Sequence, residues 1–294
     1  MIAAHETTAG VRPTLLAVLA HPDDESFGTG GTLARYAWSG VDVHLICATG
    51  GEEGTVDERH LEGYSSIGER RMAELRCAAE ALGLSSVTML GYRDSGMPGT
   101  PANNHPEALA AQPLEAVAAR VTHEIRRLRP QVVITFDPIG GYRHPDHIAC
   151  HRATVEAFHA AGDPERFPGG PPPYTPQKLY YHTFSRNLLR LMVRLMPLFG
   201  QDPRRFGRNK DVDIASLAEV EFPIHARIDI LPVLRAREAA SACHASQGGG
   251  SAGPLRLMLS RFFALLGGYE TFMRAYPPAP DGLRENDLFA GVQW

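Results

Sequence analysis

Several features that mark particular protein classes are missing from this sequence of 294 residues. It has no long uncharged apolar run, since the nearest one, 188–199, is interrupted by Arg190 and Arg194, so we expect no membrane span. Basic charge is not in excess either, because 29 Lys and Arg oppose 33 Asp and Glu and leave a net charge of -4. We therefore expect no nucleic-acid partner. Residues 1–12 lack a basic start followed by an apolar segment, so we expect no signal peptide.

Cysteine is scarce. The four cysteines are scattered along the chain without a CxxC pair, at positions Cys47, Cys77, Cys150 and Cys243. This spacing argues against a disulfide framework and against a cysteine-bound structural zinc. We expect four reduced, buried thiols, which favours a cytoplasmic location.

The first half of the chain alternates strand patterns with helix patterns. Short apolar or β-branched runs predict strands at 15–20, 41–49, 87–91 and 132–136. Between and after them, helical spacing predicts helices at 30–39, 69–82, 114–128 and 145–160. This alternation predicts an α/β fold with a mostly parallel sheet and helices on both faces. Such sheets bind ligands at the carboxyl ends of their strands.

The second half is less regular. A Pro- and Gly-rich loop at 162–176 is followed by patterns for a strand at 179–184, a helix at 187–197, a strand at 219–230 and a helix at 231–246. An apolar helix is expected from Leu255, with irregular structure after it. We interpret 1–184 as the catalytic core and 185–294 as a smaller C-terminal subdomain that completes the substrate cleft.

One helix of that subdomain is basic. Arg186, Arg190 and Arg194 recur every four residues beside apolar side chains. A helix of this kind can lie on a membrane or an anionic ligand. We favour arginines that lie over apolar surface with their charged ends in water.

Histidines and acids gather where two predicted strands end. The first strand leads into His21-Pro22-Asp23-Asp24-Glu25, and the fourth leads into the loop 137–147, which ends His144-Pro145-Asp146-His147. Neighbouring parallel strands would bring the two loops together. Catalytic zinc takes three His or Asp/Glu ligands and leaves one position for water. His21, Asp24 and His147 could supply that set, with Asp23 remaining near the water.

These two motifs, HPDDE and GYRHPDH, resemble those of the PIG-L/LmbE family of zinc-dependent N-acetylglucosaminyl de-N-acetylases. Weaker similarities lie in KLYY at 178–181 and HASQ at 244–247. The resemblance implies a Rossmann-like α/β core and makes His21, Asp24 and His147 the metal ligands. It also implies that Asp23 is the general base and that His144 stabilises the oxyanion.

The chemistry of amide hydrolysis agrees with these roles. Zinc lowers the pKa of a coordinated water toward about 7 and polarises the carbonyl, and iron(II) could occupy the same ligands. Asp23 could accept the water proton, and a protonated His144 could stabilise the oxyanion. Asp146 could orient or charge His144. Either Asp23 or His144 could protonate the departing amine.

The family resemblance implies two sugar-binding residues. Arg71, in an R-x-x-E helix, and Asp94, after the third strand, would contact sugar hydroxyls. From the residues alone, the alternative is that Arg71 pairs with Glu74, three positions later. Tyr142 could contact substrate or the oxyanion, or could serve packing.

Three further residues lie close to the motifs. We expect Glu25 to brace a ligand and not to bind the metal. His151 has helical spacing from His147 that would permit metal binding, but we interpret it as a residue of the helix face. Asp137 is either an acid of the site or a strand-end residue bonded to loop amides.

These observations, with the family resemblance, predict a metal-dependent hydrolase that removes an N-acetyl group from a small molecule containing N-acetylglucosamine, through a zinc-bound water. An amidase that cleaves a larger acyl group from a glucosaminyl thiol conjugate and a nonhydrolytic sugar-binding protein are the alternatives. A nucleotide-binding module is disfavoured, because Gly28-Thr29-Gly30-Gly31 would need glycine at Leu33 to complete GxGxxG. The sequence leaves open whether the protein forms a homo-oligomer.

Overall fold

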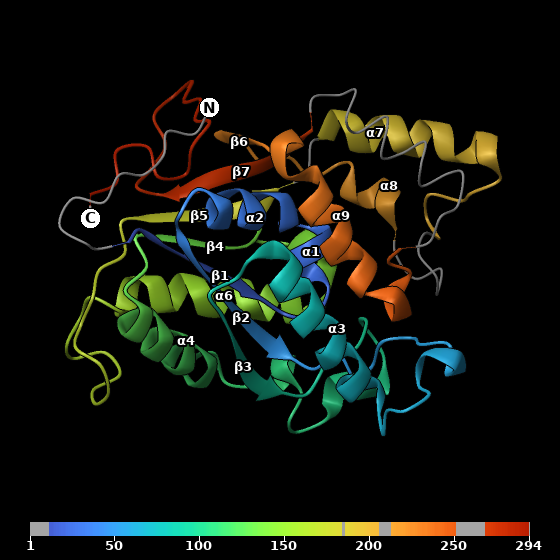
Figure 1. The fold of residues 1–294 in the computed structure, drawn as a ribbon, viewed down its shortest axis with the longest axis horizontal. Coiled ribbons are helices and arrows are strands. Elements are labelled where there is room, and N and C mark those ends of the chain that lie inside the picture. Colours follow the sequence, from blue (N-terminus) through green and yellow to red (C-terminus); the bar gives the residue numbers. More distant parts are fainter. Residues whose placement is uncertain (1–11, 184–185, 206–212, 251–267, 294) are drawn as a thin grey trace.

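The computed structural model describes residues 12–183, 186–205, 213–250 and 268–293. They contain one seven-stranded sheet with the strand order β3-β2-β1-β4-β5-β7-β6 (Figure 1). The strand bounds are β1 Thr14–Leu19, β2 Asp42–Thr49, β3 Ser86–Tyr92, β4 Val132–Phe136, β5 Lys178–Thr183, β6 Ala226–Asp229 and β7 Tyr269–Tyr276. Among the described residues no helix is both long and apolar enough to cross a membrane.

The first five strands in the chain are parallel. β1 pairs with β2 on one side and with β4 on the other, and β2–β3 and β4–β5 are parallel pairs as well. Because β1 and β4 are parallel neighbours, the loops that follow them leave the sheet at the same edge. This confirms the predicted α/β fold and its mostly parallel sheet.

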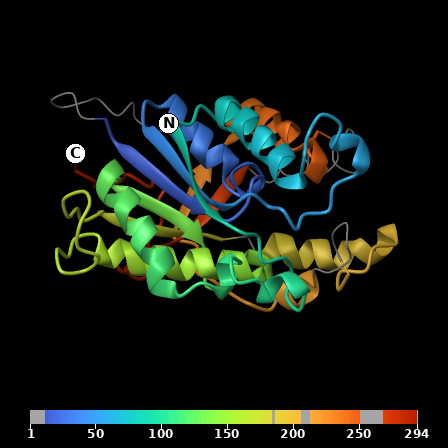
Figure 2. The same ribbon diagram turned by 90° about the horizontal axis from the view of Figure 1, so that it is seen from below.

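Two layers of helices enclose the sheet. α4 and α6 lie on one face, while α2, α3 and α9 lie on the other (Figure 2). The helix bounds are α1 Asp24–Phe27, α2 Gly30–Trp38, α3 Ile67–Leu82, α4 Leu114–Leu128, α5 Gly140–Arg143, α6 Pro145–Ala160, α7 Arg186–Leu195, α8 Ile214–Leu217 and α9 Leu234–Cys243. Short 3-10 helices occur at Glu58–His60, Pro101–Asn104, Leu109–Ala111, Met196–Phe199, Leu231–Val233 and Ala245–Gln247.

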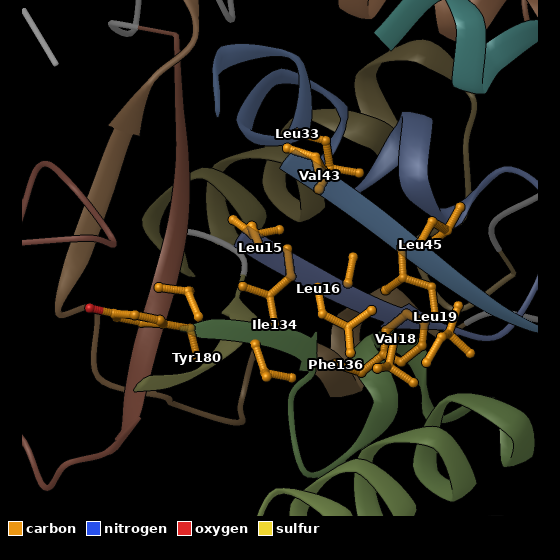
Figure 3. Packing of buried hydrophobic residues seen from close by; sticks show 14 of the residues in the cluster. Leu15, Leu16, Val18, Leu19, Leu33, Val43, Leu45, Ile134, Phe136 and Tyr180 are labelled. Carbon is orange, nitrogen blue, oxygen red and sulfur yellow. The ribbon is translucent and has the colours of Figure 1, made fainter. Parts of the chain in front are cut away.

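The core lies between these layers, around the central strands (Figure 3). β1 is buried along its whole length, as a strand covered by helices on both faces must be. Leu15 and Leu16 have no exposed surface, and full burial of one such side chain contributes about 1.5–3 kcal/mol. This central packing fixes the edge from which the loops after β1 and β4 emerge.

The C-terminal half differs from the prediction in its strands. β6 covers only part of the predicted strand 219–230, and β7 occupies residues for which we expected irregular structure. β7 forms because it pairs antiparallel with both β5 and β6, which the local sequence does not reveal. The expected apolar helix after Leu255 falls in 251–267, outside the described residues. β6 and β7 extend the core sheet. The predicted division into a catalytic core at 1–184 and a C-terminal subdomain at 185–294 stays a prediction.

The expectation of four reduced cysteines was wrong. Cys77 in α3 and Cys243 at the end of α9 form a disulfide, with their Cα atoms 5.8 Å apart. The two helices pack side by side, which brings together cysteines 166 positions apart in the chain. Cys47 and Cys150 are free and buried. The argument for a cytoplasmic location rested on reduced thiols and loses its support.

Candidate active site

The loop after β1 carries three polar side chains of the site, those of His21, Asp23 and Asp24. His21 follows β1 closely, and its backbone N–H donates to Asp24 Oδ2 at 2.8 Å. Asp23, between them, has a φ of 130°. Backbone conformations of this kind cost a non-glycine residue on the order of 1–3 kcal/mol and persist where surrounding contacts enforce them.

The loop after β4 ends in a helix cap. Gly140 has a φ of 65°, and a Cβ placed on it would lie 2.8 Å from the Cβ of His147, so a side chain is excluded there. His144 caps α6, because its Nδ1 accepts the backbone N–H of Asp146 at 3.2 Å. Pro145 suits the first helical position, where its missing N–H costs nothing. The cap fixes His147 in the first turn of α6.

The two loops bring three donor groups together. His21 Nδ1 lies 3.2 Å from His147 Nε2. Asp24 Oδ1 lies 3.3 Å from His147 Nε2, and Asp24 Oδ2 lies 3.6 Å from His21 Nδ1. All three residues are buried or nearly so. Two imidazoles and one carboxylate thus converge on a small volume, as the sequence predicts.

These separations are close to those between the ligand atoms of a tetrahedral zinc ion. Ligand atoms about 2.0–2.1 Å from zinc lie about 3.3–3.4 Å from one another in a tetrahedron. The two imidazole nitrogens lie 3.2 Å apart, Asp24 Oδ1 lies 3.3 Å from His147, and the other oxygen, Oδ2, lies 3.6 Å from His21. Two imidazole nitrogens and a carboxylate oxygen are also a donor set that zinc accepts with a fourth position open.

Two groups of buried side chains around His21 have ligand atoms close enough together to hold one metal ion, and Asp24 belongs to neither. One consists of His21, His144 and His147, and the other combines His21, Asp94, His144 and Asp146. In the second, the Asp146 and Asp94 carboxylates already accept backbone N–H groups, from Ser95 at 2.9 Å and from Gly96 at 2.8 Å. Carboxylates that already accept hydrogen bonds in this way suit the support of a ligand better than direct coordination.

Asp146 lies on the opposite side of the His21 ring from Asp24 and His147. Asp146 Oδ2 lies 3.1 Å from His21 Nε2, and the Ser95 hydroxyl donates to Asp146 Oδ1. We expected the Asp146 carboxylate to orient or charge His144. Instead, the hydrogen bond from Asp146 to His144 comes from the backbone N–H of Asp146. A carboxylate on the second nitrogen of a metal-binding histidine fixes the tautomer and the ring orientation.

The negative potential around His21 favours a cation. Burial lowers the pKa of His21, but Asp94, Asp146 and Asp24 outweigh it and raise that pKa well above its usual range. For Asp24, burial raises the pKa, and the two neighbouring histidines overcome this and lower it well below its usual range. The carboxylates that retain a proton on His21 would equally stabilise a divalent ion.

Arg71 holds the loop of Asp23. Its guanidinium donates to the carbonyl oxygens of Pro22 and Gly51, at 2.7 and 2.8 Å, and to Asp23 Oδ2 at 3.1 Å. Burial raises the pKa of Asp23 to about 6, although the charge of Arg71 opposes that rise. The alternative pairing with Glu74 is not observed among the described contacts of Arg71, because that carboxylate binds other groups.

His144 presents a neutral imidazole. Burial, together with the charges of His21 and His147, lowers its pKa to about 2. Because Nδ1 accepts a backbone N–H, the proton resides on Nε2. We expected a protonated His144, and the structure instead favours a neutral N–H donor.

The remaining candidates lie around this centre. The Tyr142 ring packs edge-on against His147, with ring centres 4.9 Å apart. Asp94 Oδ1 lies 3.5 Å from His21 Nε2. Asp137 accepts the N–H groups of loop residues 139 and 141, as one of its two interpretations predicted. His151 contacts the carbonyl oxygen of residue 136 at 2.9 Å and stays outside the donor groups.

Sequence reasoning missed several supporting residues. His244 is buried and places Nε2 2.6 Å from Glu25 Oε1. Ser246 donates from its N–H and hydroxyl to the two oxygens of Glu74, at 2.8 and 2.6 Å. Both belong to the HASQ segment, whose weak family similarity was the only signal for them. Ser95 carried no signal, because its role depends on the position of Asp146.

The chain is similar to deacetylases over nearly its whole length. Residues 16–158 match the PIG-L family, described as GlcNAc-PI de-N-acetylase. The 1D-myo-inositol 2-acetamido-2-deoxy-alpha-D-glucopyranoside deacetylase of Acidothermus cellulolyticus is 40% identical over 292 residues, covering 95% of each chain. Its namesake in Geodermatophilus obscurus is 38% identical over 296 residues, covering 95% of this chain and 97% of that one.

Solved structures share the fold. The N,N'-diacetylchitobiose deacetylase from Pyrococcus horikoshii superposes with a TM-score of 0.62 at 21% identity, covering 92% of this chain and 87% of that one. The conserved protein TT1542 from Thermus thermophilus superposes with a TM-score of 0.59 at 24% identity, covering 90% of this chain and 96% of that one.

Proposed function

The chain belongs to the PIG-L family of GlcNAc-PI de-N-acetylases, and we propose that its substrate is N-acetylglucosamine linked to myo-inositol. It is an enzyme that removes the N-acetyl group from a small molecule containing N-acetylglucosamine. The inositol part of the proposal rests on one observation. The chain is 40% identical, across 95% of both chains, to a deacetylase named for an inositol-linked substrate.

We propose that His21, Asp24 and His147 hold a zinc ion, with iron(II) as the alternative metal. The proposal is supported by the mutual separations of their donor atoms and by the negative potential around His21. When bound, such an ion lowers the pKa of a coordinated water and polarises the amide carbonyl. In the same proposal, Asp146 orients His21 from its other ring nitrogen.

Asp23 is the general base of the proposed reaction. A pKa of about 6 leaves its carboxylate largely ionised at neutral pH while making it a stronger base than an ordinary aspartate. The guanidinium of Arg71 donates hydrogen bonds to the Asp23 carboxylate and to the Pro22 carbonyl oxygen, so the base has a fixed position. Positioned proton transfer of this kind contributes about 10²–10⁴-fold to a rate.

His144 stabilises the negative charge that develops on the acetyl oxygen. Its neutral imidazole donates through Nε2–H, since Nδ1 is occupied by the cap of α6. The departing amine takes its proton from Asp23, which has received one from water, because the neutral imidazole of His144 has no acidic proton to give. Tyr142, packed against His147, would contact the acetyl group or the oxyanion.

Asp94 and Arg71 are the proposed sugar-binding residues, as the family resemblance implies. Asp94 lies 3.5 Å from His21, so its carboxylate is close to the reacting amide. Arg71 already donates hydrogen bonds to three oxygen atoms of the protein. Its main role in this proposal is therefore to hold the loop of Asp23.

Amine release from a substrate panel tests the proposal. The protein is stripped of metal, reloaded with Zn²⁺ or Fe²⁺, and given the inositol-linked N-acetylglucosaminide, free N-acetylglucosamine and conjugates with larger acyl groups. We expect the highest kcat/KM for the inositol-linked substrate with metal present. Release of larger acyl groups while the acetyl group stays intact would identify an amidase and overturn the substrate assignment.

A further inference from the structure

His244 is not one of the proposed metal ligands, but it contacts Glu25 in the segment that carries His21 and Asp24. Its side chain has no exposed surface, and Nε2 lies 2.6 Å from Glu25 Oε1, on a residue 219 positions earlier. Glu25 is equally buried, with 1% of its side chain exposed. Neither residue belongs to the buried donor groups around His21 in the described part of the chain.

Glu25 connects His244 to the backbone of Asp23. Its Oε2 accepts the Asp23 N–H at 2.9 Å, while Oε1 is held by His244 and by the Ser26 hydroxyl at 2.5 Å. Because one oxygen of the carboxylate is fixed, the other is a fixed acceptor for the Asp23 amide. That amide belongs to a residue whose φ of 130° requires support from its neighbours.

The turn that carries His244 is itself anchored to α3. Cys243, the preceding residue, is joined by the disulfide to Cys77. Ser246, two residues later, donates two hydrogen bonds to Glu74. Both anchors lie on the helix that also carries the arginine holding the Asp23 carboxylate, so one layer of the fold supports both the amide and the side chain of Asp23.

We propose that His244 is a positioning residue for Asp23: by fixing Glu25, it keeps the backbone of Asp23 in the conformation that holds the carboxylate in the site. The inference rests on the proposed role of Asp23 as general base. A displacement of about 1 Å at a reacting group can cost on the order of 100-fold in rate. The effect should therefore appear in kcat and leave the affinity for metal intact.

The test compares two replacements of His244. His244→Leu removes the donor to Glu25, whereas His244→Gln places an amide N–H near the position of Nε2. We expect His244→Leu to lower kcat on the order of 100-fold, with KM and the Zn²⁺ dissociation constant changing by less than about threefold. His244→Gln should recover most of that loss.

Ser246→Ala is the matched control. It loosens the same turn by removing the hydroxyl bond to Glu74 but leaves the contact between His244 and Glu25. We expect a lower melting temperature and nearly unchanged kcat. If Ser246→Ala reproduces the kcat loss of His244→Leu, general loosening explains the effect and the proposal is wrong.

A double-mutant cycle separates this inference from the role of Asp23. If His244 acts through Asp23, His244→Leu costs nothing further in an Asp23→Ala background, because residues that act as a unit are not additive. An equal further loss in that background, or wild-type kcat in His244→Leu alone, overturns the inference. Wild-type turnover in Asp23→Ala alone would instead refute the general-base role.

Should His244→Leu fail to fold, His244→Asn makes the same comparison with a polar side chain too short to reach Glu25.

Discussion

Replacement of Arg71 by methionine should shift the pH dependence of the enzyme in a defined direction. Arg71 lies 3.1 Å from the Asp23 carboxylate, and both side chains are mostly buried, with 5% and 19% exposed. Its positive charge lowers the pKa of Asp23, while burial holds that pKa at about 6. Removing this charge takes away the largest of the interactions that oppose burial, so the pKa rises.

The size of the shift follows from the geometry. Two unit charges about 4 Å apart interact by about 4 kcal/mol at an effective dielectric constant of about 20. Measured effects of an arginine beside an aspartate are smaller, with the pKa lowered by about 1–3 pH units. We expect the acid limb of kcat/KM to move upward from about 6 by at least about one pH unit in Arg71→Met.

The assay is the pH profile of kcat/KM for amine release, which reports the essential base of the free enzyme. Two variants serve as controls. Arg71→Lys retains the charge and should keep the acid limb near its wild-type position. Arg70→Met alters the neighbouring arginine, which binds Glu74 at 3.0 Å, and should leave the profile unchanged. An acid limb that stays in place or moves to lower pH in Arg71→Met would refute this reasoning.

Three further outcomes are expected. Asp23→Ala should keep its metal and lose about 10²–10⁴-fold in kcat, and equal activity would remove Asp23 from the mechanism. Asp146→Asn should weaken metal binding by about 10–100-fold in a chelator competition, because the support of His21 is lost; unchanged affinity would contradict that role. Replacing Cys77 and Cys243 by serine should lower the free energy of unfolding in urea by about 2–5 kcal/mol, since a cross-link over 166 positions is lost. An identical unfolding curve would argue against the disulfide.

The parts of the fold that could be predicted are those with local signals. The continuous apolar run of β1 and the helical spacing of α4 each identify an element within one segment of sequence. β7 has no comparable signal. Its Glu270 is buried in a strand because the carboxylate accepts the N–H groups of Gly31 and Thr32 at the start of α2, at 2.9 and 2.7 Å. That partner lies far away in the chain, so the strand could not be recognised locally.

The candidate site divides in the same way. Both loops of the candidate site were identifiable, because histidines and acids directly follow two strands of a parallel sheet. The partner of Asp146 was not, since the choice between His144 and His21 depends on how α6 begins. The contact of His244 with Glu25 and the disulfide depend on the packing of α9 against α1 and α3. Interactions between distant segments of this kind leave no pattern in a single sequence.

Metal content of single-residue variants tests the central claim most directly. Wild-type protein, His147→Ala and His144→Ala are loaded with Zn²⁺, dialysed, and measured by plasma mass spectrometry. If His21, Asp24 and His147 are the ligands, wild type and His144→Ala each retain one ion per chain, and His147→Ala retains almost none. Full zinc in His147→Ala, with loss in His144→Ala, would place the metal among His21, Asp94, His144 and Asp146 and contradict the account.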